Sequence, residues 1–507
     1  MLTTFISLAA RSGTAHHRAC FATRARLVGL LFVVAAGGVS GCAPDRLLGN
    51  KSLPPDVPDP AQTATPAGAL AAYRGALVEL RTAVGGDIMS FIPVTGLLTD
   101  ELRSGELAQT NFVDGAILID SRFLPEDAGI GDDSVTPTPI VMVYGLLQKV
   151  RGQSRQARGA LRAYTPTSST ALSGQLFAVE GYAEVLLSDL FCSGVPLSTL
   201  NFGGDFTYQP GSSTQEVYQH ATALFDSALA LSADSVNVMN LARVGKGRAL
   251  LDLGRYAEAA QAVADVPDDY RYTLDYSATP SPSTHGDLSN QTFVTDDFGL
   301  SSYGMLVTMV DREGGNGLPF LSSGDPRSAW GTATTYRGSP LLWPVAYPQD
   351  GSGSLVLASG VEARLIQSEG ELQAGNAAGW LATLNALRTD GTFDSHPDAA
   401  DSTKTDTLWH AGTGGVAGLA PLSDPGTADG RVDLLFQERG YWLFLTGHRQ
   451  GDLRRLVRVY GRDPERVYPT GRYPGAFNIY GTDVTAPIPG AERLSNPLFT
   501  GCRSRGA

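Results

Sequence analysis

The stretch that decides the fold is Asn240–Pro267, which reads NLARVGKGRALLDLGRYAEAAQAVADVP. Two runs of apolar and small residues, Asn240–Leu253 and Ala257–Val266, have the spacing of helices. Gly254 lies between them, where a tight turn is needed, and Pro267 ends the second run. The stretch therefore predicts two helices joined by a tight turn.

Other segments follow the same pattern. Val361–Ala374 and Ala377–Arg388 flank Gly375 in the same way. Two longer helical runs are Ile140–Tyr164 and Ala171–Phe191. The chain is therefore predicted to be built mainly from helix pairs.

Two helix starts are also marked in the sequence. Pro66 suits the first turn of a helix that runs to about Thr82. Ser213 and Glu216 have the spacing of a capping box, ahead of a further helical stripe. Together these signals predict an all-α fold, in which irregular helix pairs that resemble tetratricopeptide repeats form a scaffold.

Long inserts interrupt this scaffold. Residues 268–345 and 389–430 are rich in Gly, Ser, Thr and Pro and lack helical periodicity. Loops of this length inside a folded domain are usually functional or disordered. We expect a helical region at 66–267, a loop-rich aromatic insert at 268–345 and a second helical region at 346–507.

The first insert is the candidate ligand-capture region. Aromatic faces stack on the apolar faces of sugar rings and other cyclic ligands. The insert holds four such candidates: Tyr303, Trp330, Tyr336 and Trp343. The alternative is that these rings only pack the insert onto the helices.

The N-terminus has the form of a lipoprotein signal peptide. Arg24 and Arg26 precede the apolar run Leu27–Ala36, and Gly41-Cys42 follows a stretch of small residues. We expect residues 1–41 to be removed and Cys42 to carry the lipid; a plain signal peptide with an incidental cysteine is the alternative. Residues 42–65 are Pro-rich and are predicted to form a tether.

Composition limits the possible partners. Hydrophobic residues make up 42% of the chain and charged residues 18%, as in a folded protein, and the net charge is −13. This acidic balance argues against nucleic acid, and leaves neutral or cationic ligands open. Two cysteines, Cys192 and Cys502, would remain beyond Cys42 in an exported protein. They form either a disulfide, which an oxidising compartment permits, or two buried free thiols.

The C-terminal region carries the most specific pattern. It contains, in order, Leu434-Leu435-Phe436-Gln437-Glu438-Arg439, Thr446-Gly447-His448-Arg449, Asp452-Leu453-Arg454-Arg455, Pro487-Ile488-Pro489, Glu492 and Asn496-Pro497. This order and spacing resemble the SusD/RagB family of outer-membrane nutrient-uptake lipoproteins. Looser agreement upstream is found at Val195-Pro196-Leu197, Asp325-Pro326-Arg327 and the Glu362–Glu369 helix.

The resemblance implies a function without catalysis. A member of this family would sit on the outer membrane, capture a nutrient, most commonly a glycan, and hand it to a TonB-dependent barrel receptor. The family also implies that ligand contacts come from the inserts. A repeat-based envelope scaffold without a small ligand is the alternative.

The charged residues of this C-terminal pattern can also be interpreted without the family resemblance. Arg side chains beside carboxylates at helix ends form bidentate pairs that fix helix orientation. We therefore interpret five residues as structural, with ligand contact as the alternative: Glu438, Arg439, His448, Arg449 and Asp452.

Signals of enzymatic chemistry are missing from the sequence. It contains no His-Glu-x-x-His helix, no Cys-x-x-Cys zinc pair and no Gly-x-Ser-x-Gly elbow. We therefore predict no catalytic residues, no metal site and no cofactor.

Overall fold

The computed structural model describes residues 64–86, 89–104, 115–125, 138–166, 170–201, 205–276, 307–309, 311, 316–328, 330–336, 339–344, 353–389, 393–397, 405–409, 419–473 and 479–507. They lie in one compact unit, Pro60–Ala507. The signal peptide, Cys42 and the Pro-rich tether fall outside the described residues.

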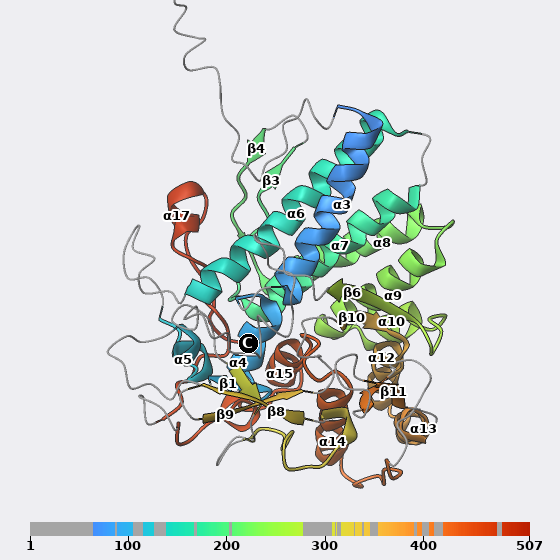
Figure 1. Ribbon diagram of the computed structural model, residues 1–507, viewed down its shortest axis with the longest axis vertical. Coiled ribbons are helices and arrows are strands. Elements are labelled where there is room, and N and C mark those ends of the chain that lie inside the picture. Colours follow the sequence, from blue (N-terminus) through green and yellow to red (C-terminus); the bar gives the residue numbers. More distant parts are fainter. Residues whose placement is uncertain are drawn as a thin grey trace, which may run out of the picture. The chain divides into compact units, whose positions relative to one another are not determined.

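Successive helices pack side by side through the first half of the chain (Figure 1). They are α3 (Pro66–Gly85), α6 (Thr138–Tyr164), α7 (Thr170–Leu190), α8 (Thr214–Leu231), α9 (Val236–Asp252) and α10 (Tyr256–Ala262). Each packs against the next, and the short helices α4 (Phe91–Leu98) and α5 (Gly115–Asp120) lie between α3 and α6 in sequence. The prediction of a helix-pair scaffold is confirmed.

Local signals explain most helix boundaries. The Ser213 hydroxyl accepts the Glu216 N–H and the Glu216 carboxylate accepts the Ser213 N–H, so the capping box is formed. Helix α9 begins at Val236, earlier than predicted, because the Ser235 hydroxyl caps it. Helix α10 ends at Ala262 and is shorter than predicted, since turns occupy the residues before Pro267.

A phenylalanine sits between glycines where three helices cross. A Cβ added at Gly245 of α9 would lie 2.4 Å from the ring of Phe225, and one at Gly181 of α7 would lie 2.9 Å from it. The same ring makes an edge contact with Tyr182 at 5.3 Å between centroids. Small residues at these positions therefore let α7, α8 and α9 approach closely around one aromatic side chain.

The helix series continues beyond the insert. Helix α12 (Gly360–Gln373) packs against α10 and pairs with α13 (Ala377–Thr389). The remaining helices are α14 (Ala428–Trp442), α15 (Arg449–Arg458), α16 (Pro464–Val467) and α17 (Ala491–Ser495). Helix α15 packs against α4 and α7, so the C-terminal region returns to the N-terminal helices.

A two-stranded antiparallel sheet closes the base of the first insert. Strand β6 (Arg271–Tyr276) leaves the scaffold just after α10, and β10 (Gly353–Ser359) leads directly into α12. The Gly360 N–H donates to the Tyr270 carbonyl at 2.9 Å. The chain therefore leaves and re-enters the scaffold at the same place.

Other strand pairs lie between the helices, in part within the two inserts. They are β1 (Leu102–Ser104) with β7 (Val307–Met309), β8 (Trp330–Tyr336) with β9 (Ser339–Pro344), and β11 (Phe393–Pro397) with β12 (Thr405–Trp409). Two shorter pairs are β2 (Val195–Pro196) with β5 (Gly211–Ser212) and β3 (Thr199–Leu200) with β4 (Phe206–Thr207). The fold is mostly helical, as predicted, and its strands are short additions.

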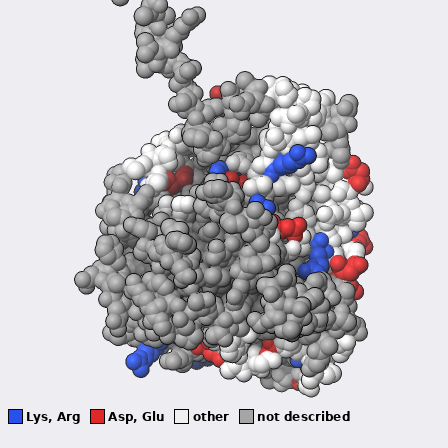
Figure 2. Space-filling view, in the orientation of Figure 1, with Lys and Arg blue, Asp and Glu red and all other residues white. Residues whose placement is uncertain are grey.

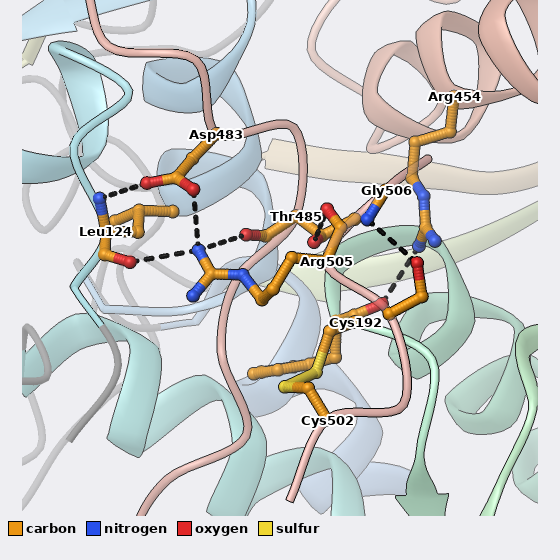
Figure 3. Close-up of a disulfide and its surroundings, with 10 residues drawn as sticks. Leu124, Cys192, Arg454, Asp483, Thr485, Cys502, Arg505 and Gly506 are labelled. Atoms are coloured by element: carbon orange, nitrogen blue, oxygen red, sulfur yellow. Dashed lines mark hydrogen bonds and ion pairs between the residues drawn. A yellow bond between two sulfur atoms is a disulfide. The ribbon is translucent and has the colours of Figure 1, made fainter. Parts of the chain in front are cut away.

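A disulfide ties the C-terminus to the end of α7 (Figure 3). Cys192 and Cys502 are bonded, with their Cα atoms 5.8 Å apart and a sequence separation of 310. Next to it, the Arg505 guanidinium donates to the Leu124 carbonyl and to the Asp483 carboxylate, each at 2.9 Å. The last residues are therefore fixed to three distant segments.

Among the described residues, none of the helices has both the length and the apolar character needed to cross a membrane.

Candidate functional site

Three of the four predicted ligand residues lie on one β-hairpin. Trp330 and Tyr336 are the first and last residues of β8, and Trp343 lies on β9. Trp343 is opposite Gly331, one position from Trp330, whereas Tyr336 lies beside the turn. The hairpin thus brings two tryptophans to neighbouring register positions at its open end. Tyr303 and the side chains of Tyr336 and Trp343 fall outside the described residues.

Trp330 combines exposure with a fixed orientation. It is 44% exposed, and its indole Nε1 donates to the Leu321 carbonyl at 3.2 Å. One edge of the ring is therefore held by the protein, and much of the residue remains open to solvent. An aromatic side chain held in this way is suited to stacking against an apolar ring face.

The segment that leads into Trp330 is held in place by hydrogen bonds within its own loop. The Asp311 carboxylate accepts the N–H groups of Leu321 at 2.7 Å and Ser322 at 2.9 Å. The Ser328 hydroxyl donates to the Phe320 carbonyl at 2.8 Å, and Phe320 is 1% exposed. This loop gives the hairpin a rigid base.

Arg327 fastens that base to α14. Its guanidinium donates to Glu438 at 2.8 Å and to Asp325 at 2.7 Å. The same group lies over the rings of Tyr441 and Trp442, at 5.1 and 4.8 Å from their centroids. The Asp325-Pro326-Arg327 triplet is therefore an anchor, and sequence reasoning had not paired it with Glu438.

Glu438 is shared by several donors. Besides Arg327, it accepts from Arg388 of α13 at 2.6 Å and from the Trp442 indole at 3.2 Å. Glu438 itself is 1% exposed. One carboxylate thus joins the hairpin base to α13 and α14.

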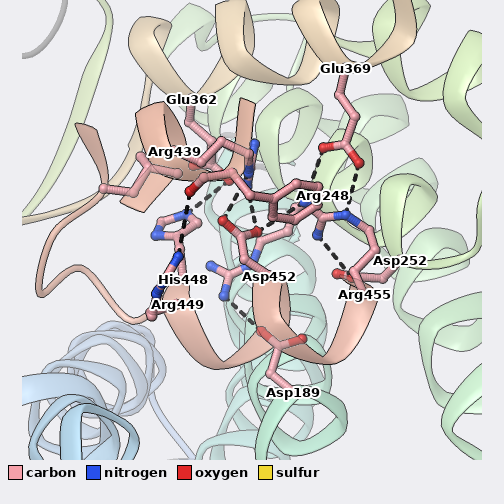
Figure 4. Close-up of polar contacts among 12 residues, drawn as sticks. Asp189, Arg248, Asp252, Glu362, Glu369, Arg439, His448, Arg449, Asp452 and Arg455 are labelled. Atoms are coloured by element: carbon pink, nitrogen blue, oxygen red, sulfur yellow. Dashed lines mark hydrogen bonds and ion pairs between the residues drawn. The ribbon is translucent and has the colours of Figure 1, made fainter. Parts of the chain in front are cut away.

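A larger network of buried charges surrounds α15 (Figure 4). Arg439 and Asp452 form a bidentate pair, with both N–O distances at 2.8 Å. Arg455 forms a second bidentate pair with Glu369 of α12, at 3.0 Å for both bonds, and also donates to Asp452 at 2.9 Å. These pairs link α12, α14 and α15.

The other two motif residues reach different helices. Both guanidinium bonds from Arg449 to Asp100, which follows α4, are 2.6 Å long. His448 Nε2 lies 3.0 Å from a Glu362 carboxylate oxygen of α12. All five motif residues named from the sequence are at most 5% exposed and have partners inside the protein. Their geometry is that of residues that hold helices together.

Paired arginines keep two of these carboxylates ionised. Burial alone would raise the pKa of Asp452, but Arg439 and Arg455 lower it well below its ordinary value. Burial likewise opposes ionisation of Asp100, and Arg449 reverses the effect, so the pKa of Asp100 is lowered.

The pKa of Glu101 is shifted in the opposite direction. Burial raises its pKa to about 8, although one carboxylate oxygen accepts the Leu445 N–H at 2.7 Å. The folded protein therefore retains a proton that the unfolded chain releases above its ordinary pKa, so stability from this group falls as pH rises toward 8.

This pKa gives a testable pH dependence. We expect Glu101→Gln to reduce the loss of unfolding free energy between pH 5 and pH 9 by at least about 1 kcal/mol, because the amide cannot ionise. Urea unfolding at several pH values measures this, with Glu258→Gln at an exposed position as the control. Parallel pH profiles for the Glu101→Gln variant and the unchanged protein would contradict the raised pKa.

Several members of the buried charge network around the motif were missed by sequence reasoning. Asp189 accepts from Arg248 at 2.7 Å and Asp252 lies 3.2 Å from Arg455, yet both aspartates lie far from the motif in sequence. Their signal was an acidic residue inside an otherwise apolar helical run, as in Leu186-Leu187-Ser188-Asp189-Leu190. Such residues are buried only when they are paired.

The described residues contain no group of three or more His, Cys, Asp or Glu side chains that could hold a metal ion. On the face shown in Figure 2, the basic and acidic side chains of the described part are interspersed.

Solved structures share this fold. A SusD superfamily protein from Parabacteroides distasonis matches with a TM-score of 0.60 at 14% identity, over 86% of this chain and 99% of that one. A SusD superfamily protein from Bacteroides thetaiotaomicron matches with a TM-score of 0.59 at 15% identity, over 87% of this chain and 100% of that one. The chain has the SusD fold.

A third similar structure carries a description of its ligand class. It is described as a SusD-like carbohydrate-binding protein from Bacteroides vulgatus, and it matches with a TM-score of 0.55 at 14% identity over 86% of this chain and 97% of that one. No family model matches the sequence, and no curated protein matches it. The SusD fold is therefore established here by structure rather than by sequence.

Proposed function

We propose that this SusD-like chain captures a nutrient, with a glycan as the first candidate, and delivers it to a TonB-dependent barrel transporter. The observation that carries the proposal is Trp330: an exposed indole, fixed by Leu321 and braced through Arg327 on the buried Glu438. A rigid aromatic face at the end of an anchored hairpin suits stacking on a sugar ring. The carbohydrate-binding SusD-like relative supports the same class of ligand.

The proposal includes the outer membrane as the site of action. Lipidation of Cys42 would anchor the chain, and the Pro-rich residues 42–65 would separate the lipid from the helical body. Capture in this form needs no covalent step, which agrees with the lack of catalytic motifs in the sequence. Purification of the full chain from intact outer membranes is expected to recover a barrel receptor with it.

A glycan-binding comparison tests the role of the tryptophan. The full chain is screened on a glycan array, and the best ligand is then titrated by calorimetry. We expect Trp330→Ala to weaken binding at least tenfold, or about 1.4 kcal/mol, because a stacked aromatic anchor is lost. Trp343→Ala is expected to weaken binding as well.

Phe206→Ala is the matched control, because Phe206 is an aromatic residue of β4 that is 53% exposed and far from the hairpin in sequence. Equal affinity of the Trp330→Ala and Phe206→Ala variants would show that the glycan does not bind at the hairpin. A chain that binds no glycan and recovers no barrel would favour the envelope scaffold instead.

A further inference from the structure

A pocket lies on the C-terminal region, at a different place from the hairpin. Its volume is about 710 Å³, and it is formed by α14, α15, the segment around α16 and the loop at 316–318. This volume is in the range of small-molecule sites. Its described lining residues include none from β8 or β9.

The floor of the pocket is apolar. Leu318 and, on α15, Leu456 line it with partly exposed side chains, and the lining residues Phe436 and Leu453 are almost fully buried, at 3% and 1% exposed. These side chains belong to the packed body of the protein, so the floor is preformed. A ligand with one C–H face could rest on it without rearranging the core.

The rim is polar and includes two exposed side chains that are not engaged in the packing of the protein. Asp433 and Gln437 lie one turn apart on the outward face of α14, and Arg462 and Arg466 face them from the segment around α16. Arg462 lies 3.2 Å from Asp433. Within the described part of the chain, neither the Gln437 amide nor the Arg466 guanidinium has a side-chain partner, so both are available to a ligand.

The charges of the rim balance. Two guanidinium groups, Arg462 and Arg466, face two carboxylates, Asp433 and Asp463. The remaining charged lining residue, Arg449, is neutralised by Asp100. An anion would meet the carboxylates and a cation would meet the arginines, so the pocket favours a neutral ligand with many hydrogen-bonding groups.

The geometry of the polar groups selects among neutral ligands. Carboxylate, amide and guanidinium groups each present two coplanar hydrogen-bonding atoms, and neighbouring hydroxyls on a sugar ring present a matching pair. We propose that this pocket binds a neutral saccharide unit through its vicinal hydroxyls, with the C–H face of the ring on the apolar floor. The inference extends the proposed glycan capture, on which its biological meaning rests, to a second point of contact with its own residues.

Binding of defined sugars by the full chain tests this pocket. The probes are tetrasaccharides of glucose, mannose, galactose and xylose, with a galacturonate tetrasaccharide as the charged comparison. The double variant Gln437→Leu/Arg466→Leu is expected to lose at least tenfold in affinity for the preferred neutral probe. Both residues are exposed, so its thermal unfolding should match that of the unchanged protein. A deoxy form of the preferred probe, lacking one hydroxyl of the pair, should bind the unchanged protein less tightly by a similar factor.

The outcomes separate the two sites. If affinity falls in the Gln437→Leu/Arg466→Leu variant but not in Trp330→Ala, the pocket is supported and the hairpin is excluded as a binding site. Affinity that falls only in Trp330→Ala overturns the pocket and leaves the proposed function standing. Preference for the galacturonate probe overturns the pocket proposal, and no binding to any probe overturns both.

Discussion

Replacing Arg455 with methionine is expected to lower the free energy of unfolding by about 3–5 kcal/mol, because three buried carboxylates would lose their common cation. Arg455 is 1% exposed and contacts Glu369, Asp452 and Asp252 at 2.9–3.2 Å. Burial makes each of these carboxylates costly to leave unpaired. The effect is measured as a shift of the urea unfolding curve, followed by circular dichroism.

Arg255→Met is the matched control for this substitution. Arg255 also contacts a carboxylate, Glu258, but both side chains are about half exposed. Exposed pairs contribute little to stability, so the control should unfold almost as the unchanged protein does. Equal shifts in the two variants would show that the network around α15 does not depend on Arg455.

Removing the disulfide is the other change with a large expected effect. The double variant Cys192→Ala/Cys502→Ala should be less stable by about 2–5 kcal/mol, since the bond closes a very long loop in the unfolded chain. Cys192 is also fully buried in the main core, next to the strand-like contact between Ser193 and Ser504. Thermal unfolding with and without a reducing agent measures the effect.

The double variant also supplies the control for this experiment. A reducing agent should lower the unfolding temperature of the unchanged protein and leave that of the variant where it is. An unchanged protein that unfolds identically in both conditions would mean that the two cysteines are not bonded.

Helical periodicity was enough to predict the scaffold. The pair around Gly254 and the pair around Gly375 form where expected, and both glycines adopt positive φ angles, 71° and 77°. Periodicity is a local property of the sequence, so it transfers directly to local structure. Helix ends depend on caps such as Ser235, which explains the small shifts.

The strands of the inserts were harder to predict. Thr332, Thr334 and Thr335 in β8 have high β-propensity, but Gly, Ser and Pro around them hid the signal. Strand pairing also joins segments that are distant in sequence, as in β6 with β10. A single sequence contains no direct record of such contacts.

The residue types of the candidate site could be predicted from the sequence, but the ion pairs that position it could not. The aromatic residues of the insert stood out by type, and two tryptophans do lie in neighbouring register positions. Nothing in the sequence linked Arg327 to Glu438, or Arg449 to Asp100, because each pair is separated by more than a hundred residues. These long-range ion pairs fix where the hairpin base and α15 lie.

The sheet of β6 and β10 brings the two ends of the first insert together. Because its two ends are held together at Tyr270 and Gly360, lengthening or exchanging the residues between them adds only a slowly growing entropic cost. Stretches of the insert that do not contact the helices can therefore be lengthened or exchanged while the helical body keeps its fold, whereas Arg327 and β7 hold other parts of the insert to α14 and β1.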